Sequence, residues 1–302
     1  MSHRQILPLA LFLALVLARC LGAGNPAVSP AAASKPASVK VAAVQFRSTF
    51  GDPADNRKRL EVCIREAAKN DAKIVVLPEA AITGYTSEDL KTTWQVGARQ
   101  LNKGFTAGKD PAACAETVPG TSTEQFSKLA GDLGIYLTIP FIEREGEGVA
   151  AKYFNTVCLA DPTGKIVLHY RKLNPWPYPE ASWATKGDRG YQTIDTPYGR
   201  LGLLICFDIN YEPPQLKKLK VDTLLYCIAW VDGETSTWFT KELPGIAKEN
   251  NLNIIGADWT LSQKPDWFGY GHSLILTREG VALVRCKDDL KEEILYADLP
   301  VR

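Results

Sequence analysis

The sequence predicts an α/β fold, and three stretches carry that prediction. Residues 201–208 (LGLLICFD) form an apolar run of the length expected for a strand that is buried on both faces. Residues 73–77 (KIVVL) form a second such run. Residues 55–70 place apolar side chains at helical spacing, which is typical of a helix with one buried face. Buried strands that alternate with amphipathic helices predict an α/β domain.

The first half of the chain predicts strands, two helices and a hairpin. The helices are expected at residues 55–70 and at 122–133, where Gly134 closes the second. The expected strands are 39–46, 73–77, 135–142, and a hairpin of 153–160 with 165–170. Residues 83–119 have weak periodicity, so we expect a long loop that borders a site.

The second half repeats the alternation of strands and helices. A helix is expected at residues 236–250, with Pro244 as a possible kink. The expected strands are 201–208, 222–229, 253–257, 273–276, 281–286 and 293–297. No low-complexity linker follows Ser38, so residues 39–302 are expected to form one domain.

The N-terminal residues have the composition of an export signal. An apolar stretch at 6–18 follows Arg4, and small residues follow it, so residues 1–24 are predicted to be a signal peptide. Residues 25–38, rich in Ala, Pro and Ser, are expected to be a flexible spacer. The protein is therefore predicted to be secreted or periplasmic, without stable membrane insertion after cleavage. Its formal net charge of +1 and lack of basic runs argue against nucleic acid as a partner.

Cys206 is a candidate nucleophile because it ends a buried strand just before a short helix. Functional groups in α/β folds gather at this edge of the sheet. The alternative is a small core residue, the commonest role of a buried cysteine. Only His169 and His272 follow the signal segment, and each could be structural. No Gly-x-Ser-x-Gly elbow and no metal-ligand spacing occur, so no metal and no cofactor are expected.

A carboxylate and an ammonium are better partners for the thiol. Glu79 follows the buried strand 73–77, as Cys206 follows its own strand, and Lys172 ends the expected strand that begins near residue 167. Taken singly, Glu79 could be a solvated charge at a strand end, and Lys172 could form a solvated basic pair with Arg171. Burial would raise the pKa of the carboxyl group, and the nearby Lys172 would lower that of the thiol, so glutamate could serve as the base.

Together these residues and their flanks resemble a known signature. LPE at 77–79, YRKL at 170–173 and ICFD at 205–208 are similar to the Glu-Lys-Cys motifs of the nitrilase superfamily of carbon–nitrogen hydrolases. The resemblance implies a four-layer αββα sandwich and association into a homo-oligomer. It implies that Glu79, Lys172 and Cys206 are catalytic and that Glu180 is a second glutamate at the site. In the mechanism expected for such a site, the Lys172 ammonium and the Phe207 N–H are the candidate stabilisers of the oxyanion.

The resemblance leaves the substrate open. Asn210 stands where many members have arginine, and the form Cys-Phe-Asp-Ile looks more like the secreted biotinidase and pantetheinase branch, which favours a small-molecule amide over a nitrile. Trp230 and Trp176 are the expected substrate contacts. A nitrile hydrolase and an N-acyltransferase would use the same triad. A binding protein that retains the fold is the alternative outside enzymes.

Overall fold

The computed structural model describes residues 37–101, 104–233, 235–264 and 268–301, all within one compact unit, Lys35–Arg302. The predicted signal peptide and nearly all of the predicted spacer lie outside the described residues. The first strand begins at Ser38, within one residue of the expected start of the domain.

One sheet contains the strands from the first part of the chain and the last strand. Its order is β14-β1-β2-β5-β6-β7. The parallel centre, β1, β2 and β5, is flanked by antiparallel neighbours. The bounds are β1 Ser38–Gln45, β2 Ile74–Val76, β5 Tyr136–Glu145, β6 Lys152–Ala160, β7 Ile166–Arg171 and β14 Glu293–Pro300.

The second sheet contains the strands from the later part of the chain, in the order β13-β12-β11-β10-β9-β8. Its centre, β9 to β11, is parallel. The bounds are β8 Thr193–Thr196, β9 Gly199–Ile205, β10 Thr223–Cys227, β11 Asn253–Ala257, β12 Leu274–Leu276 and β13 Ala282–Arg285. The sequence did not predict β8, because this four-residue strand ends in the turn signal that precedes β9.

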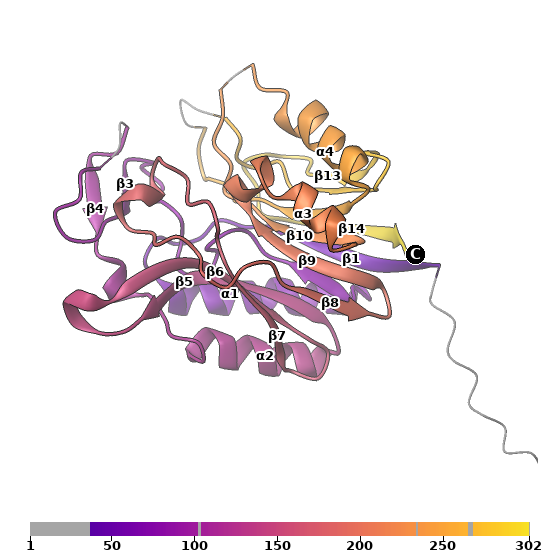
Figure 1. The fold of residues 1–302 in the computed structure, drawn as a ribbon, viewed down its shortest axis with the longest axis horizontal. Helices are drawn as coiled ribbons and strands as arrows, with labels where there is room; N and C mark the ends of the chain where they lie inside the picture. Colours follow the sequence, from indigo (N-terminus) through magenta and orange to yellow (C-terminus); the bar gives the residue numbers. More distant parts are fainter. Residues whose placement is uncertain (1–36, 102–103, 234, 265–267, 302) are drawn as a thin grey trace, which may run out of the picture. The chain divides into compact units, whose positions relative to one another are not determined.

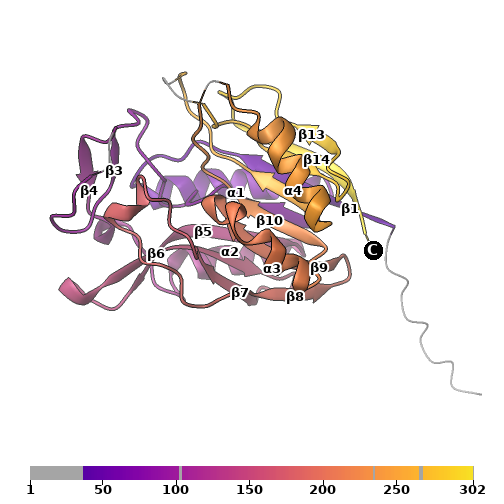
Figure 2. The same ribbon diagram turned by 45° about the horizontal axis from the view of Figure 1, so that its top comes forward.

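Alternate side chains of β1 show how the layers stack. Val41 and Ala43 share a buried cluster with Leu224 of the second sheet, so this face of the first sheet packs on the second. Ala42 packs with Leu60 in a different cluster, which contains the helices α1 (Pro53–Lys69) and α2 (Thr121–Leu133). The outer face of the second sheet carries α3 (Pro213–Lys218) and α4 (Leu243–Asn250) (Figures 1 and 2). The four-layer αββα sandwich is confirmed.

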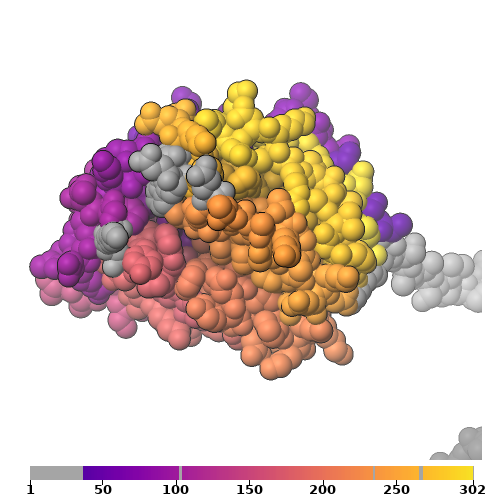
Figure 3. Space-filling view, turned by 90° about the horizontal axis from the view of Figure 1, so that it is seen from above, coloured from indigo at the N-terminus to yellow at the C-terminus, as the bar shows by residue number. Residues whose placement is uncertain are grey.

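Two segments differ from the sequence prediction. The expected loop 83–119 contains a small parallel sheet of β3 (Thr92–Trp94) and β4 (Ala107–Lys109), and a short 3₁₀ helix, Pro111–Ala113. The indole N–H of Trp94 donates to the Gly84 carbonyl at 2.9 Å and anchors this excursion. In Figure 3 its purple atoms lie at the left, and the orange and yellow C-terminal segments form much of the right side.

The expected helix 236–250 is divided. A π-helical turn, Trp238–Glu242, precedes α4. Pro244 lies in the first turn of α4, directly after the π-helical turn. Within the described part of the chain, no helix is long and apolar enough to cross a membrane.

Candidate active site

Three strand ends bring the predicted catalytic residues into one region between the sheets. Glu79 follows β2, and Lys172 directly follows β7 of the same sheet. Cys206 directly follows β9 of the opposite sheet. The backbone N–H of Glu79 donates to the Ile228 carbonyl, just beyond β10, at 3.2 Å. This bond ties the loop after β2 to the sheet that carries the thiol.

The polar side chains form one buried cluster around the Lys172 ammonium. Lys172 Nζ donates to Glu79 Oε1 at 2.7 Å and to Glu180 Oε2 at 2.5 Å. Asn155 Nδ2 lies 2.6 Å from Glu79 Oε1 and 2.6 Å from Glu180 Oε1. None of these four side chains is more than 1% exposed. Glu180, predicted as the second glutamate, therefore contacts Lys172 directly.

The cluster holds Glu79 ready to exchange a proton near neutral pH. Burial raises the pKa of Glu79 to about 7, although Lys172 opposes the shift; Glu180 adds to it. Burial alone would lower the pKa of Lys172, but Glu180 and Glu79 together raise it. The lysine therefore stays charged, and Glu79 can serve as a base or an acid.

The Cys206 backbone is held in a strained conformation by a set of hydrogen bonds. Its φ of 40° lies in the left-handed region, which a residue with a side chain seldom adopts. The Tyr226 hydroxyl donates to the Cys206 carbonyl at 2.9 Å. The buried Asp208 carboxylate accepts from the Tyr170 hydroxyl at 2.7 Å and from the Asn174 backbone N–H at 2.7 Å. These bonds fix the turn that presents the thiol.

The resting form of Cys206 differs from the expectation. Lys172 lowers the pKa of the thiol, as expected, but burial and the Glu79 charge outweigh it and raise that pKa well above its ordinary value. The backbone N–H of Ala229 also lowers the pKa of the thiol. The resting cysteine is therefore a neutral thiol, and its proton must leave as the sulfur attacks.

Several buried polar atoms at the cluster have no hydrogen-bond partner among the described residues. They include Glu79 Oε2, Asn155 Oδ1 and the Tyr85 hydroxyl. Glu79 and Tyr85 line a small pocket together with Thr86 and Trp259. Orphaned polar atoms are rare in protein interiors, and at a pocket they indicate where a substrate or water binds.

The three residues predicted to contact substrate lie around this cluster. The Trp176 backbone N–H donates to Glu180 Oε2 at 2.6 Å, and its side chain packs against the apolar cluster that contains Tyr85 and Trp259. Trp230 stacks on Trp238 with ring centroids 4.1 Å apart. Phe207 follows Cys206 directly. None of the three is among the residues that line the pocket at Glu79, and their contact with substrate stays a prediction.

Sequence reasoning did not assign Asn155, Asp208, Tyr85 or Tyr226 to the site. Asp208 lies inside one of the motifs that carried the resemblance, so its signal was present, whereas Asn155 lies within the expected hairpin strand 153–160. Tyr85 follows Gly84 in a long segment without periodicity. Tyr226 reads as an ordinary apolar position of a strand, because only the structure shows that its hydroxyl reaches the Cys206 carbonyl.

The remaining candidates for acid–base chemistry lie elsewhere. His169 Nε2 is 2.8 Å from Glu143 Oε2, and the alternation of side chains along the strand places His169 on the face opposite Lys172. His272 lies beside Asp289. All six cysteines of the described chain are free thiols.

Comparison with known proteins identifies the family. Residues 40–302 match the family model of carbon–nitrogen hydrolases. Omega-amidase NIT2 of Homo sapiens is 29% identical over 259 residues, which cover 82% of this chain and 84% of that protein. An aliphatic nitrilase of Sinorhizobium fredii is 34% identical over 202 residues, covering 67% of this chain and 62% of the nitrilase.

Solved structures show the same fold. The crystal structure of an amidase from Nesterenkonia sp. superposes with a TM-score of 0.66 at 21% identity, covering 89% of this chain and 93% of the amidase. The motifs around Glu79, Lys172 and Cys206, the sandwich and the match over nearly the whole described domain agree. The chain belongs to the carbon–nitrogen hydrolase family of the nitrilase superfamily and is a hydrolase of carbon–nitrogen bonds other than peptide bonds.

Proposed function

We propose that this protein is an amidase that hydrolyses a small carboxamide to an acid and ammonia or an amine through a thioester on Cys206. The observation that carries the proposal is the buried cluster in which Lys172 bridges Glu79 and Glu180 next to the strained Cys206 turn. An omega-amidase among the relatives and an amidase among the structural neighbours support an amide substrate.

Acylation begins with transfer of the thiol proton to Glu79. Glu79 Oε2 has no hydrogen-bond partner among the described residues, so it is free to accept that proton. The sulfur attacks the amide carbon, and the carbonyl oxygen becomes an oxyanion that the Lys172 ammonium and the Phe207 N–H stabilise. One such donor is typically worth about 10²–10³ in rate. Glu79 then protonates the leaving nitrogen, the carbon–nitrogen bond breaks, and a thioester remains.

Deacylation uses the same groups in reverse roles. Glu79, again a carboxylate, takes a proton from water, and the resulting hydroxide attacks the thioester carbon. The tetrahedral intermediate expels the Cys206 sulfur, which regains a proton from Glu79, and the acid leaves. Glu180 accepts a hydrogen bond from Lys172, and Asn155 donates one to Glu79, so these two side chains hold Lys172 and Glu79 in place.

Intact-mass spectrometry with fluoroacetamide tests whether Cys206 is the reactive thiol, because a sulfur that displaces fluoride keeps the acetamide moiety as a thioether. A structure of a glutamate-to-glutamine mutant of the Nesterenkonia amidase carries the acetamide moiety of fluoroacetamide on its active-site cysteine. We expect one acetamide adduct on this protein, absent in Cys206→Ala and retained in Cys63→Ser, a control thiol on α1. An adduct that persists in Cys206→Ala would overturn the assignment of the nucleophile.

Ammonia release from paired amide and nitrile substrates tests the choice of bond. The aliphatic nitrilase among the relatives makes nitrile hydrolysis the second candidate. We expect acetamide and butyramide to be hydrolysed with a kcat/KM well above that of the matching nitriles. The opposite order would make the protein a nitrilase with the same triad, and acyl transfer to hydroxylamine without hydrolysis would make it an acyltransferase.

We further propose that the protein is exported and self-associates. The apolar segment 6–18 and the small residues after it support export. N-terminal sequencing of protein from the producing cells should start after Ala23 or Gly24, and a retained Met1 would contradict export. Light scattering of the isolated protein should give the mass of a homo-oligomer; the mass of one chain would contradict self-association.

A further inference from the structure

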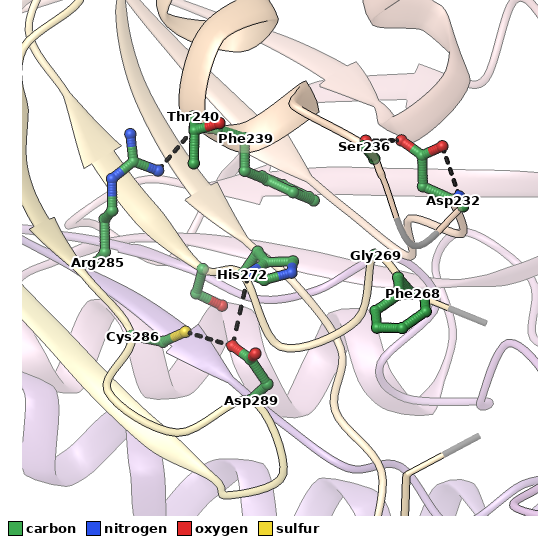
Figure 4. A pocket seen from close by; sticks show the side chains of 12 residues that line it. Asp232, Ser236, Phe239, Thr240, Phe268, Gly269, His272, Arg285, Cys286 and Asp289 are labelled. Atoms are coloured by element: carbon green, nitrogen blue, oxygen red, sulfur yellow. Dashed lines mark hydrogen bonds and ion pairs between the residues drawn. The ribbon is translucent and has the colours of Figure 1, made fainter. Parts of the chain in front are cut away.

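A second group of chemically reactive side chains lies at a pocket apart from Glu79, Lys172 and Cys206. His272 lies in the turn between β11 and β12, Cys286 directly follows β13, and Asp289 lies in the turn before β14. The donor atoms of these three residues all lie within 4.8 Å of one another (Figure 4). They line a pocket of about 310 Å³.

The two distances from the Asp289 carboxylate to its neighbours match the edges of a metal coordination shell. Asp289 Oδ1 is 3.3 Å from Cys286 Sγ and 3.5 Å from His272 Nδ1. A tetrahedral zinc ion with bonds of about 2.0–2.3 Å separates its ligand atoms by roughly 3.3–3.7 Å. Asp289 can therefore share a cation with both neighbours with little movement.

The order of contacts argues against a second thiol nucleophile. In a Cys-His-Asp arrangement the imidazole lies between the thiol and the acid, so that it can accept the thiol proton. Here the Asp289 carboxylate lies between Cys286 and His272. A carboxylate between a thiol and an imidazole suits a shared cation, because all three are metal ligands.

The surrounding structure holds the three ligands in place. Gly271 has φ +74°, and a Cβ there would lie 2.2 Å from the Asp289 carbonyl oxygen, so glycine is required for this close approach. The fully buried Gln45 of β1 donates to the Asp288 carbonyl at 3.0 Å and to the Lys291 carbonyl at 2.9 Å, which fixes the turn that carries Asp289. Such support is what a pre-organised ligand set needs.

We propose that His272, Cys286 and Asp289 bind a zinc-class divalent cation, with the fourth coordination position facing the pocket. The side chains of His272 and Asp289 are 37% and 48% exposed, so an ion can enter. Arg285 also lines the pocket and gives it a positive group that suits an anionic or water ligand at the fourth position. On binding, the Cys286 thiol forms a sulfur–metal bond and releases its proton to solvent. The proposal does not depend on amidase activity.

Cobalt(II) titration of the full chain carrying Cys206→Ala, reduced and stripped with a chelator, tests this site. The active-site thiol is then absent, and a thiolate-to-cobalt charge-transfer band reports Cys286. We expect one equivalent of cobalt, displaced by zinc, with release of one proton. The band should vanish when Cys286→Ser is added and persist when Cys63→Ser is added. His272→Gln and Asp289→Asn should each weaken binding at least about tenfold.

Three results of the cobalt titration would overturn the proposed site. A band that survives Cys286→Ser, or affinities unchanged in both His272→Gln and Asp289→Asn, would overturn the site, as would a stripped protein that binds no cobalt. Should Cys286→Ser fail to fold, the two conservative variants decide alone. At the same zinc concentration, zinc should also raise the Tm of the Cys206→Ala chain by more than the Tm of its Asp289→Asn derivative.

Discussion

Arg171 and Lys172 are consecutive, equally buried, and paired with carboxylates on opposite sides of the first sheet. The Arg171 guanidinium donates to Glu143 Oε1 at 2.5 Å and to Asp188 Oδ1 at 2.9 Å, and it lies 3.8 Å from the centre of the Phe154 ring. Lys172 donates to Glu79 and Glu180. Neither cationic side chain is more than 2% exposed.

The pKa values of Glu143 and Glu79 nevertheless shift in opposite directions. Burial raises the pKa of both, but hydrogen bonds from His169, Arg171 and Thr156 reverse the shift at Glu143 and lower its pKa to about 2. At Glu79 burial prevails and the pKa reaches about 7. Glu79 shares its single ammonium with Glu180 and keeps one unpartnered oxygen. The number of donors per carboxylate thus separates a structural ion pair from a group that can exchange protons.

The largest expected effect is on turnover in Glu79→Gln. The amide cannot accept the thiol proton, so kcat should fall about 10²–10⁴-fold, the usual worth of general acid–base catalysis. The neutral side chain still fits beside Lys172 and Asn155, so far-ultraviolet circular dichroism should be unchanged. Steady-state kinetics on the best carboxamide measure the loss. Near-normal kcat would show that Glu79 is not the base.

The matched substitution, Glu143→Gln, should lower the free energy of unfolding and leave turnover nearly unchanged. It leaves the buried Arg171 with one carboxylate fewer, and breaking a buried ion pair costs about 3–5 kcal/mol. Urea denaturation monitored by tryptophan fluorescence measures the free energy of unfolding. Turnover of the folded protein should stay close to that of the unmodified chain. If Glu143→Gln lost activity as severely as Glu79→Gln, the two clusters would not be separate in function.

The catalytic rate and the stability of the protein should depend on pH in two different ranges, one set by Glu79 and the other by Glu143. Glu79 must be a carboxylate to take the thiol proton, so kcat/KM should fall as the pH drops below about 7. The pKa of Glu143 is lower in the folded protein than its ordinary value of 4.5, so its stabilising contribution is complete above pH 4.5 and is lost as the pH falls toward 2.

Rate and stability profiles over the same pH range measure the two effects. The acid limb of kcat/KM should shift or disappear in Glu79→Gln, while the acid loss of stability should become shallower in Glu143→Gln. A rate profile that stays flat down to pH 5 would contradict a Glu79 pKa of about 7.

The smallest expected effect concerns the Cys206 turn. Tyr170→Phe removes one hydrogen bond to the buried Asp208, which should cost about 1–3 kcal/mol of unfolding free energy because an acceptor loses its partner. A modest fall in kcat should accompany it as the turn loosens. Lys128→Ala, which removes an exposed ion pair with Asp132, is the control and should change stability by at most about 0.5 kcal/mol. Equal effects would mean that Asp208 does not support the turn.

Sequence reasoning placed Glu79, Lys172 and Cys206 at strand ends because a residue's type and its position in the pattern carried that information. Glu79 and Cys206 follow buried apolar runs and Lys172 ends a strand, so the sheet topology brings the three together once the strands are assigned. The same reasoning could not tell that Arg171 is buried, because a basic pair at a strand end looks solvated until its acidic partners are known. It also could not foresee that burial outweighs Lys172 at the Cys206 thiol, since that balance depends on three-dimensional packing.

The group of His272, Cys286 and Asp289 shows a second kind of site that sequence patterns do not reveal. Its members come from two separate turns, so the spacing that identifies local metal motifs is absent and the sequence predicted no metal. The turns meet because β12 pairs with both β11 and β13, and because Gly271 permits a close approach that no spacing rule describes. The placement nearest the biotinidase and pantetheinase branch stays a prediction.

Because the site is divided between two sheets, the catalytic rate depends on how the two sheets of the sandwich are positioned relative to each other. Glu79 and Lys172 belong to one sheet and Cys206 to the other, so relative sliding of the sheets separates base from nucleophile even when every strand is intact. Replacing a residue in the layer between the sheets, such as Val76 or Leu225, with a larger one should therefore reduce kcat under conditions in which the protein is still folded. Fluctuations that separate the two sheets would then leave the molecule native but inactive while they last. Hydrogen exchange of the β2 and β10 amides would detect such fluctuations.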